Sequence, residues 1–310
     1  MQKTTEIKKT SEESINKNGP SATAEVIALY RAVESLRPED ERICYDPYAV
    51  HFIERPDYLK LLELLSSDLQ KAMAIMQEGE RLYPGVHNTI LARVRYFDDF
   101  VRTSVSEGIE QIVILGAGYD SRAYRIEELK KRVKIFEVDH PATQRVKMEK
   151  IEGIFGGLPG HVVYVPIDLR IDDLGQRLSD HGYERSQTAL FVMEGLVYYI
   201  SPRTVDEILS FIARNSGKGS KVIFDYLPES VVDGTCTLEA GKNLRLKVEQ
   251  QGENFHFGIN KGTVETFLAK RGFSQIINVT SVDYKKAYFH GKNESREIGS
   301  LLSFAHAMVE

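Results

Sequence analysis

The sequence predicts an α/β fold: a doubly wound, mostly parallel seven-stranded sheet whose last strand is antiparallel, with a helical N-terminal cap. Three observations support this prediction. The first third of the chain carries apolar residues at helical spacing, the middle alternates short apolar runs with segments that can be helical, and a glycine pair directly follows the first of those runs. Apolar strands that alternate with helices are typical of a parallel sheet covered on both faces, and right-handed crossovers wind such a sheet doubly.

The N-terminal part of the chain is expected to hold a tail and a cap. Residues 1–20 are polar and charged, so we expect a disordered tail and no signal peptide. Helical spacing begins after Ser21, an apolar helical face covers residues 58–76, and a further helix is predicted over residues 86–105. Residues 21–108 are therefore the predicted helical cap.

Residues 109–310 are expected to form the sheet and its covering helices. The five apolar runs are short and lie between segments that can be helical, as the strands of a parallel sheet do. These predicted strands cover residues 111–115, 133–138, 161–167, 188–193 and 221–226.

The C-terminal region completes the predicted sheet. We expect a helix over residues 262–270, a turn at Gly272-Phe273 and a strand over residues 275–282. A last strand over residues 301–309 is expected to return by a short antiparallel hairpin. Residues 228–257 show little periodicity, and we interpret them as an insertion that forms part of a substrate pocket at the ligand-binding edge of the sheet.

The composition excludes several classes of function. The 310 residues carry a formal net charge of −5, which gives no general attraction for nucleic acid or for an anionic membrane. No apolar stretch has the length of a membrane span. Cys44 and Cys236 have no Cys or His nearby at metal-ligand spacing, so we expect a reducing, cytoplasmic environment and no metal site.

The main chemical signal is the loop Gly116-Ala117-Gly118-Tyr119-Asp120, which directly follows the first predicted strand. Glycines there let the backbone turn tightly and approach a ligand, although a lone Gly-x-Gly also fits an ordinary turn. Ser121 stands where a dinucleotide fingerprint has its third glycine. Asp120 would repel a pyrophosphate but would attract a cationic, phosphate-free cofactor. The loop therefore favours S-adenosylmethionine over NAD.

Acidic residues also follow the next three predicted strands. Asp139 stands where an acid can accept hydrogen bonds from both ribose hydroxyls, although its position before Pro141 also fits a helix cap. Asp168 follows the third strand, where an acid can accept from an adenine amino group, and Glu194 follows the fourth. Because the carboxyl ends of parallel strands meet at one edge, we expect these acids and Asp120 to share a site.

A cofactor that carries a carboxylate also needs a basic partner, for which arginine is best suited. Arg93 and Arg95 lie on the helix predicted before the first strand, two residues apart, so they point to different sides of it. Either one fits an ordinary solvated helix face equally well.

Together these motifs resemble the leucine carboxyl methyltransferase family, which includes protein phosphatase carboxyl methyltransferases and bacterial polyketide O-methyltransferases. The resemblance spans about residues 25–290. It rests on VILGAGYDSRAYRI at 113–126, FEVDHP at 136–141, IDL at 167–169, MEGLVYY at 193–199, and on DPYA at 46–49 and ARVRYFD at 92–98.

The resemblance implies a class I methyltransferase fold that binds S-adenosylmethionine. On the matching positions, Arg93 is implied to bind the methionine carboxylate of the cofactor, and Gly116 to line its methionine moiety. Gly118 and Asp120 belong to the same cofactor loop, and Asp139 is implied to hold the ribose.

For the remaining positions, the resemblance implies that Asp168 and Leu169 frame the adenine. Glu194 is implied to lie near the cofactor amino group and the reacting methyl group. Tyr198 follows Glu194 closely in sequence and can shape the acceptor pocket, although a role as a core aromatic explains it equally well. These two are the candidate catalytic residues. Arg31 is a candidate for a further basic contact with the cofactor.

The predicted reaction is methyl transfer to an oxygen atom of a small molecule or of a protein C-terminal carboxylate. A carboxylate acceptor needs no base, whereas a hydroxyl needs one. The candidate bases are His87, His140, His256 and His290. Two alternatives stay open: an NAD-dependent oxidoreductase on a Rossmann-like sheet, and a non-catalytic binding protein on the same fold.

The first prediction concerns Asp139. If its carboxylate pairs with the ribose hydroxyls, Asp139→Ala should weaken binding of S-adenosylhomocysteine by about 1–3 kcal/mol, the cost of unmade hydrogen bonds. Isothermal titration calorimetry measures this directly, and an unchanged affinity would remove the assignment.

Overall fold

The computed structural model describes residues 21–250 and 252–310, so the tail expected at residues 1–20 lies outside the described residues. The fold contains a seven-stranded sheet of order β3-β2-β1-β4-β5-β7-β6, in which β7 runs antiparallel to both of its neighbours. The predicted fold class is confirmed. The strands are β1 (Gln111–Leu115), β2 (Lys134–Asp139), β3 (Val162–Pro166), β4 (Ala189–Met193), β5 (Lys221–Tyr226), β6 (Phe273–Val279) and β7 (Ser303–Val309).

The first third of the chain is helical, as predicted. Ser21 begins the first helix, because its side chain accepts a hydrogen bond from the backbone N–H of Ala24 at 3.1 Å. The elements before the sheet are α1 (Ala22–Ser35), η1 (Ala49–Phe52), α2 (Pro56–Ser67), α3 (Leu69–Leu82) and α4 (Val86–Ser106). No helix within residues 21–250 and 252–310 is long and apolar enough to cross a membrane.

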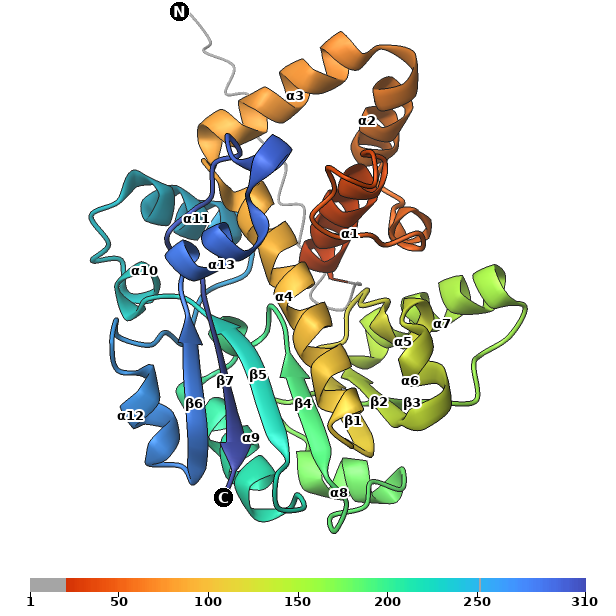
Figure 1. Cartoon of the computed structure of the whole chain (residues 1–310), viewed down its shortest axis with the longest axis vertical. Helices are drawn as coiled ribbons and strands as arrows, with labels where there is room; N and C mark the ends of the chain where they lie inside the picture. Colours follow the sequence, from red (N-terminus) through yellow and green to blue (C-terminus); the bar gives the residue numbers. More distant parts are fainter. Residues whose placement is uncertain (1–20, 251) are drawn as a thin grey trace, which may run out of the picture.

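The predicted apolar face over residues 58–76 differs from the structure in two ways. Asp68 divides the segment into α2 and α3 and caps the second helix by accepting from the backbone N–H of Lys71. The helix pair also buries little, since α2 has no buried residue and α3 buries only Ala72. Figure 1 shows the two helices projecting above the sheet. The helical periodicity therefore predicts the helices correctly, but it does not predict whether their apolar residues are buried.

The helices after β1 connect the parallel strands and cover the sheet. They are α5 (Arg122–Arg125), α6 (Glu127–Arg132), α7 (Pro141–Phe155), α8 (Leu174–Asp180), η2 (Val197–Tyr199) and α9 (Pro202–Arg214). On one face Phe97 of α4 meets Phe304 of β7, and on the other Phe211 of α9 meets Phe191 of β4. The sheet is thus buried between two helical layers, as its near-continuous apolar strands predict (Figure 1).

The insertion at residues 228–257 contains two helices that periodicity did not predict. These are α10 (Glu229–Asp233) and α11 (Glu239–Gln250). Helix α11 buries only Gly241 and Val248, so its apolar stripe is too narrow to read from sequence.

The C-terminal region corrects two boundaries and one connection. The remaining elements are α12 (Val264–Ala269), β6, α13 (Ser281–Tyr288), η3 (Gly291–Asn293) and β7. The turn was expected to include Phe273, which instead begins β6, and the strand ends at Val279 because Thr280 and Asp283 form a capping box that starts α13. β6 and β7 do pair antiparallel, but α13 and η3 separate them, so the expected short hairpin is wrong.

Gly85 generates a stability prediction. It precedes α4 with φ +69°, and a Cβ atom there would lie 2.2 Å from the backbone carbonyl carbon of Ile298. Gly85→Ala should therefore lower the free energy of unfolding by more than about 2 kcal/mol, because steric overlap adds to the cost of a left-handed alanine. The matched control is Gly108→Ala, which has φ +97° and open space around its Cβ. It should cost only about 1–2 kcal/mol. Equal losses in urea denaturation would contradict the prediction.

Candidate functional site

A cavity of about 1060 Å³ opens at the carboxyl ends of the parallel strands. It is bounded by α1, α4, the insertion at 228–257 and the segment before β7. Ligands bind at this edge in doubly wound sheets. The residues that the sequence nominated as catalytic or cofactor-binding all line it: Arg93, Gly116, Gly118, Asp120, Asp139, Asp168, Leu169, Glu194 and Tyr198.

The glycine loop after β1 has a backbone that requires glycine. Gly116 and Gly118 have φ +66° and +42°, and a Cβ on Gly116 would lie 3.0 Å from the side chain of Leu196. The loop is anchored to the neighbouring strand because the N–H groups of Gly116 and Ala117 both donate to the carbonyl of Val138, at 2.9 and 3.1 Å. The backbone of the loop therefore forms part of the cavity wall, where a ligand can approach it closely.

Asp139 is held by backbone groups alone. Its carboxylate accepts hydrogen bonds from the N–H of Gly118 and, at 2.6 Å, from the N–H of His140. Burial raises the pKa of this carboxyl group, although the two N–H donors oppose the rise. Because the side chain has no basic partner within 4 Å among the described residues, lone pairs remain for hydroxyl donors in the cavity.

The preference for a cationic cofactor assumed that the charge of Asp120 is uncompensated, but in the structure this carboxylate has a basic partner. Arg122 binds it twice, through a side-chain ion pair and through its backbone N–H at 2.7 Å. Burial raises the pKa of Asp120, but the charge of Arg122 outweighs it and lowers the pKa to about 2. Its negative charge is therefore largely compensated within the protein, which corrects the electrostatic part of the sequence argument.

Asp168 lines the cavity just after the end of β3. Its carboxylate pairs with Arg170 at 2.6 Å, and the hydrogen bond from that guanidinium lowers its pKa to about 2. Leu169, between them in sequence, also lines the cavity. The pair and the leucine together offer a polar and an apolar contact at the end of β3.

Arg93 is buried and already bound to two carboxylates. Its guanidinium pairs with Glu194 at 3.0 Å and with Asp225 at 2.7 Å. The Nη2 group makes no hydrogen bond within the described residues, so it is the part of Arg93 left to meet a ligand carboxylate. Arg95 points to the other side of α4, where it is exposed and pairs with Asp99.

Asp225 was missed from sequence. It lies near the end of β5, is fully buried, and accepts from Arg93, from the hydroxyl of Tyr198 at 3.1 Å and from the N–H of Gly195 at 2.6 Å. A signal existed, because the run KVIFDY places an acid near a strand end as the four preceding strands do. Asp225 thereby fixes Tyr198 and the turn after β4.

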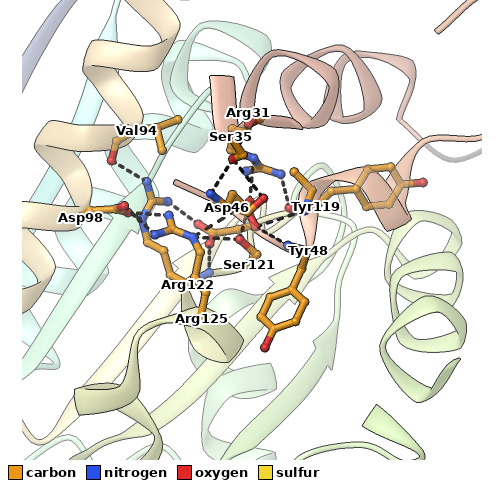
Figure 2. Close-up of polar contacts among 12 residues, drawn as sticks. Arg31, Ser35, Asp46, Tyr48, Val94, Asp98, Tyr119, Ser121, Arg122 and Arg125 are labelled. Atoms are coloured by element: carbon orange, nitrogen blue, oxygen red, sulfur yellow. Dashed lines mark hydrogen bonds and ion pairs between the residues drawn. The ribbon is translucent and has the colours of Figure 1, made fainter. Parts of the chain in front are cut away.

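A buried polar cluster below the glycine loop joins it to α1 and α4 (Figure 2). Figure 2 shows Arg122 and Arg125 both directed at Asp98 of α4, at 2.7 and 2.6 Å. On the other side of the loop, Arg31 donates to the carbonyl of Tyr119 at 2.6 Å and pairs with Asp46 at 3.1 Å. Arg31, the weak candidate for a cofactor contact, thus supports the loop while also lining the cavity.

The candidate bases divide into two groups. His140 and His256 line the cavity, whereas His87 and His290 do not. His87 packs against Tyr30 with the ring planes tilted by 40°, and burial lowers its pKa to about 4. Within the described residues, no group of three or more His, Cys, Asp or Glu is arranged to hold a metal ion.

Comparison with known proteins identifies the family. Residues 24–213 match the family described as leucine carboxyl methyltransferase. The chain belongs to this family. It is similar to a Mycobacterium avium protein provisionally named an S-adenosyl-L-methionine-dependent methyltransferase, with 32% identity over 81% of this chain and 82% of that protein. It is also similar to the Bacillus subtilis protein YktD, which has the same provisional name, with 25% identity over 95% of this chain and 99% of that one.

Solved structures agree with this fold. A provisionally assigned methyltransferase of Thermobifida fusca superposes with a TM-score of 0.59 at 13% identity, covering 98% of this chain and all of that one. A protein of Streptomyces avermitilis, described as a duf574 family member, gives a TM-score of 0.56 at 11% identity over 96% of this chain and all of that chain.

Asp98 provides a test of the buried cluster. Asp98→Ala leaves two buried guanidinium groups without this partner, so it should lower the free energy of unfolding by about 3–5 kcal/mol. The control is Asp206→Ala, which removes a half-exposed partner of Arg271 and should cost less than about 1 kcal/mol. Comparable losses for the two variants in chemical denaturation would show that the cluster does not stabilise the fold.

Proposed function

We infer that this chain is an S-adenosylmethionine-dependent methyltransferase, and we propose that it transfers the methyl group to an oxygen atom of a carboxylate or hydroxyl acceptor. The observation that supports the proposal is the arrangement of the glycine loop, Asp139, Asp168 and Glu194 around one cavity, at the ends of β1 to β4 in a member of this family. The provisional names of its relatives agree with the cofactor.

The residues around the cavity fit the cofactor. Its volume, about 1060 Å³, is at the upper end of ordinary ligand pockets, which leaves room for an acceptor beside the cofactor. The positive φ of +66° at Gly116 disfavours any other residue, and the loop backbone there borders the cavity. Asp139 offers the free lone pairs that ribose hydroxyls require.

Each residue has a proposed task. Asp139 holds the ribose, Asp168 and Leu169 frame the adenine, and Gly116 lies along the methionine portion. The Nη2 group of Arg93 meets the methionine carboxylate, a charge-assisted contact. Glu194, which lies against Arg93 at 3.0 Å and Arg122 at 2.7 Å, faces the amino group of the cofactor.

When bound, S-adenosylmethionine would supply a methyl group activated on a sulfonium for transfer to the acceptor oxygen, and would leave as the thioether. The protein contributes alignment and exclusion of water, which together account for much of the rate of such displacements. Tyr198 takes part by position, because its hydroxyl donates to Asp225 and burial raises its pKa, so it stays protonated.

The pairing of Glu194 favours a carboxylate over a hydroxyl acceptor. Two guanidinium groups bind this carboxylate, so its oxygens are already engaged by groups of the protein rather than left for a hydroxyl acceptor. A carboxylate acceptor is ionised at neutral pH and needs no base. For a hydroxyl acceptor, His140 and His256 are the histidines of the cavity that remain available.

Membership of the family leaves the NAD-dependent oxidoreductase without support. We propose that the protein turns over rather than only binding the cofactor, and that its acceptor is a small molecule or a protein C-terminal carboxylate. No nucleic-acid or membrane partner is proposed, and the net charge of −5 agrees with this.

The function is tested by ligand stabilisation and by product chemistry. S-adenosylhomocysteine should raise the Tm, whereas NAD should not. At a ligand concentration a hundred times the Kd, binding should increase the free energy of unfolding by about 2.7 kcal/mol. Incubation of cell extract with methyl-labelled cofactor should yield labelled product that releases methanol in base, as a methyl ester does. A base-stable labelled ether would show a hydroxyl acceptor, and stabilisation by NAD alone would overturn the proposal.

A further inference from the structure

The outer part of the cavity, away from the strand ends, is mainly apolar. Residues of α1, α4, α11 and the segment before β7 line it. Its side chains include Ile27, Ile90, Leu244, Val248, Phe255 and Leu302. Such a lining favours an apolar segment of a bound molecule, because it offers no partner for a charged group of that segment.

One cation of the cavity differs from the others. Arg31, Arg93 and Arg170 line the cavity too, but each is bound to a carboxylate. Lys247 of α11 has no carboxylate within 4 Å among residues 21–250 and 252–310. Its ammonium group lies over the ring of Tyr83, 4.2 Å from the ring centre, and burial lowers its pKa.

Lys247 lies at the opposite end of the cavity from the predicted cofactor contacts. Its neighbour Tyr83 precedes the start of α4 at Val86, whereas Arg93 lies seven residues further along that helix, about 10 Å nearer the strand ends. Asp139 and Glu194, by contrast, stand at the ends of β2 and β4. Among the described residues, the cavity therefore has acids and backbone donors beside the strand ends, an apolar lining, and one ammonium group without a carboxylate partner at its outer end.

We propose that Lys247 binds a carboxylate at the outer end of the methyl acceptor. The acceptor is then an elongated apolar hydroxy acid or diacid, and the hydroxyl or carboxylate at its opposite end is methylated beside Glu194. This inference rests on the proposed function. A half-buried ammonium that contacts an aromatic ring but no carboxylate has lost part of its hydration, and a carboxylate restores the lost interaction through a charge-assisted hydrogen bond. A neutral alcohol or amide at the same place gains less, so the lysine selects for an acid.

The test compares a diacid with a diol of equal length. The full-length protein is saturated with S-adenosylhomocysteine, and the Kd values of dodecanedioate and dodecanediol are measured by isothermal titration calorimetry. The wild-type protein should bind the diacid more tightly. Lys247→Met should raise the Kd of the diacid about 10–100-fold, the value of a charge-assisted hydrogen bond, and leave the Kd of the diol within about twofold.

Two further variants separate charge from structure. Lys247→Arg keeps the charge and should retain most of the preference for the diacid. Lys242→Met removes an exposed lysine of the same helix, one that pairs with Glu239, and should change neither Kd. The inference is overturned if the wild-type protein shows no preference for the diacid, if the preference survives in Lys247→Met, or if that variant loses diol binding equally.

The binding of S-adenosylhomocysteine itself distinguishes the two levels of the proposal. If no variant, including the wild-type protein, binds it, the proposed function fails. If all variants bind it with equal affinity while the diacid preference is absent, the assignment of Lys247 fails and the methyltransferase function stands.

Discussion

A continuous chain of buried arginines and carboxylates holds helix α4 against the ends of the central strands. It runs from Arg125 to Asp98, on to Arg122, and from there through Glu194 and Arg93 to Asp225, with contacts of 2.6–3.0 Å. Burying any one of these charges alone costs several kcal/mol, so each residue constrains its neighbours. The loop after β1 and the turn after β4 are held in the positions at which all of these ion pairs form.

This constraint shapes the chemistry of the site. Glu194 and Asp120 carry charge into the cavity wall, yet arginines from α4 and α5 compensate both. Asp139 is different, because only backbone N–H groups hold it. The inner end of the cavity therefore combines fixed, compensated charges with one carboxylate able to accept new hydrogen bonds, an arrangement preorganised for a polar ligand. The unpaired cation, Lys247, lies at the other end.

Much of the fold follows from patterns within single segments. The five parallel strands begin and end within two residues of their predicted bounds, because a strand buried on both faces is a short apolar run between helical segments.

The pattern failed where burial depends on distant partners. The apolar residues of α2 and α3 were expected to face a core, yet Leu59, Leu69 and Met73 are exposed. Nothing within the segment encodes whether another layer covers it.

The sequence by itself determined the glycine loop and the acids at the ends of β1 to β4, since chain order and strand direction place these residues at one edge. Only the tertiary structure decided how their charges are used. The pairing of Asp120 with Arg122 is local, but that of Arg93 with Asp225 joins residues 132 positions apart. The lack of a partner for Lys247, which distinguishes it from every other cation of the described cavity, likewise appears only once the helices are packed. Spacing along the chain sets which strand end a residue occupies, whereas the distance between side chains from different elements sets which charges remain available to a ligand.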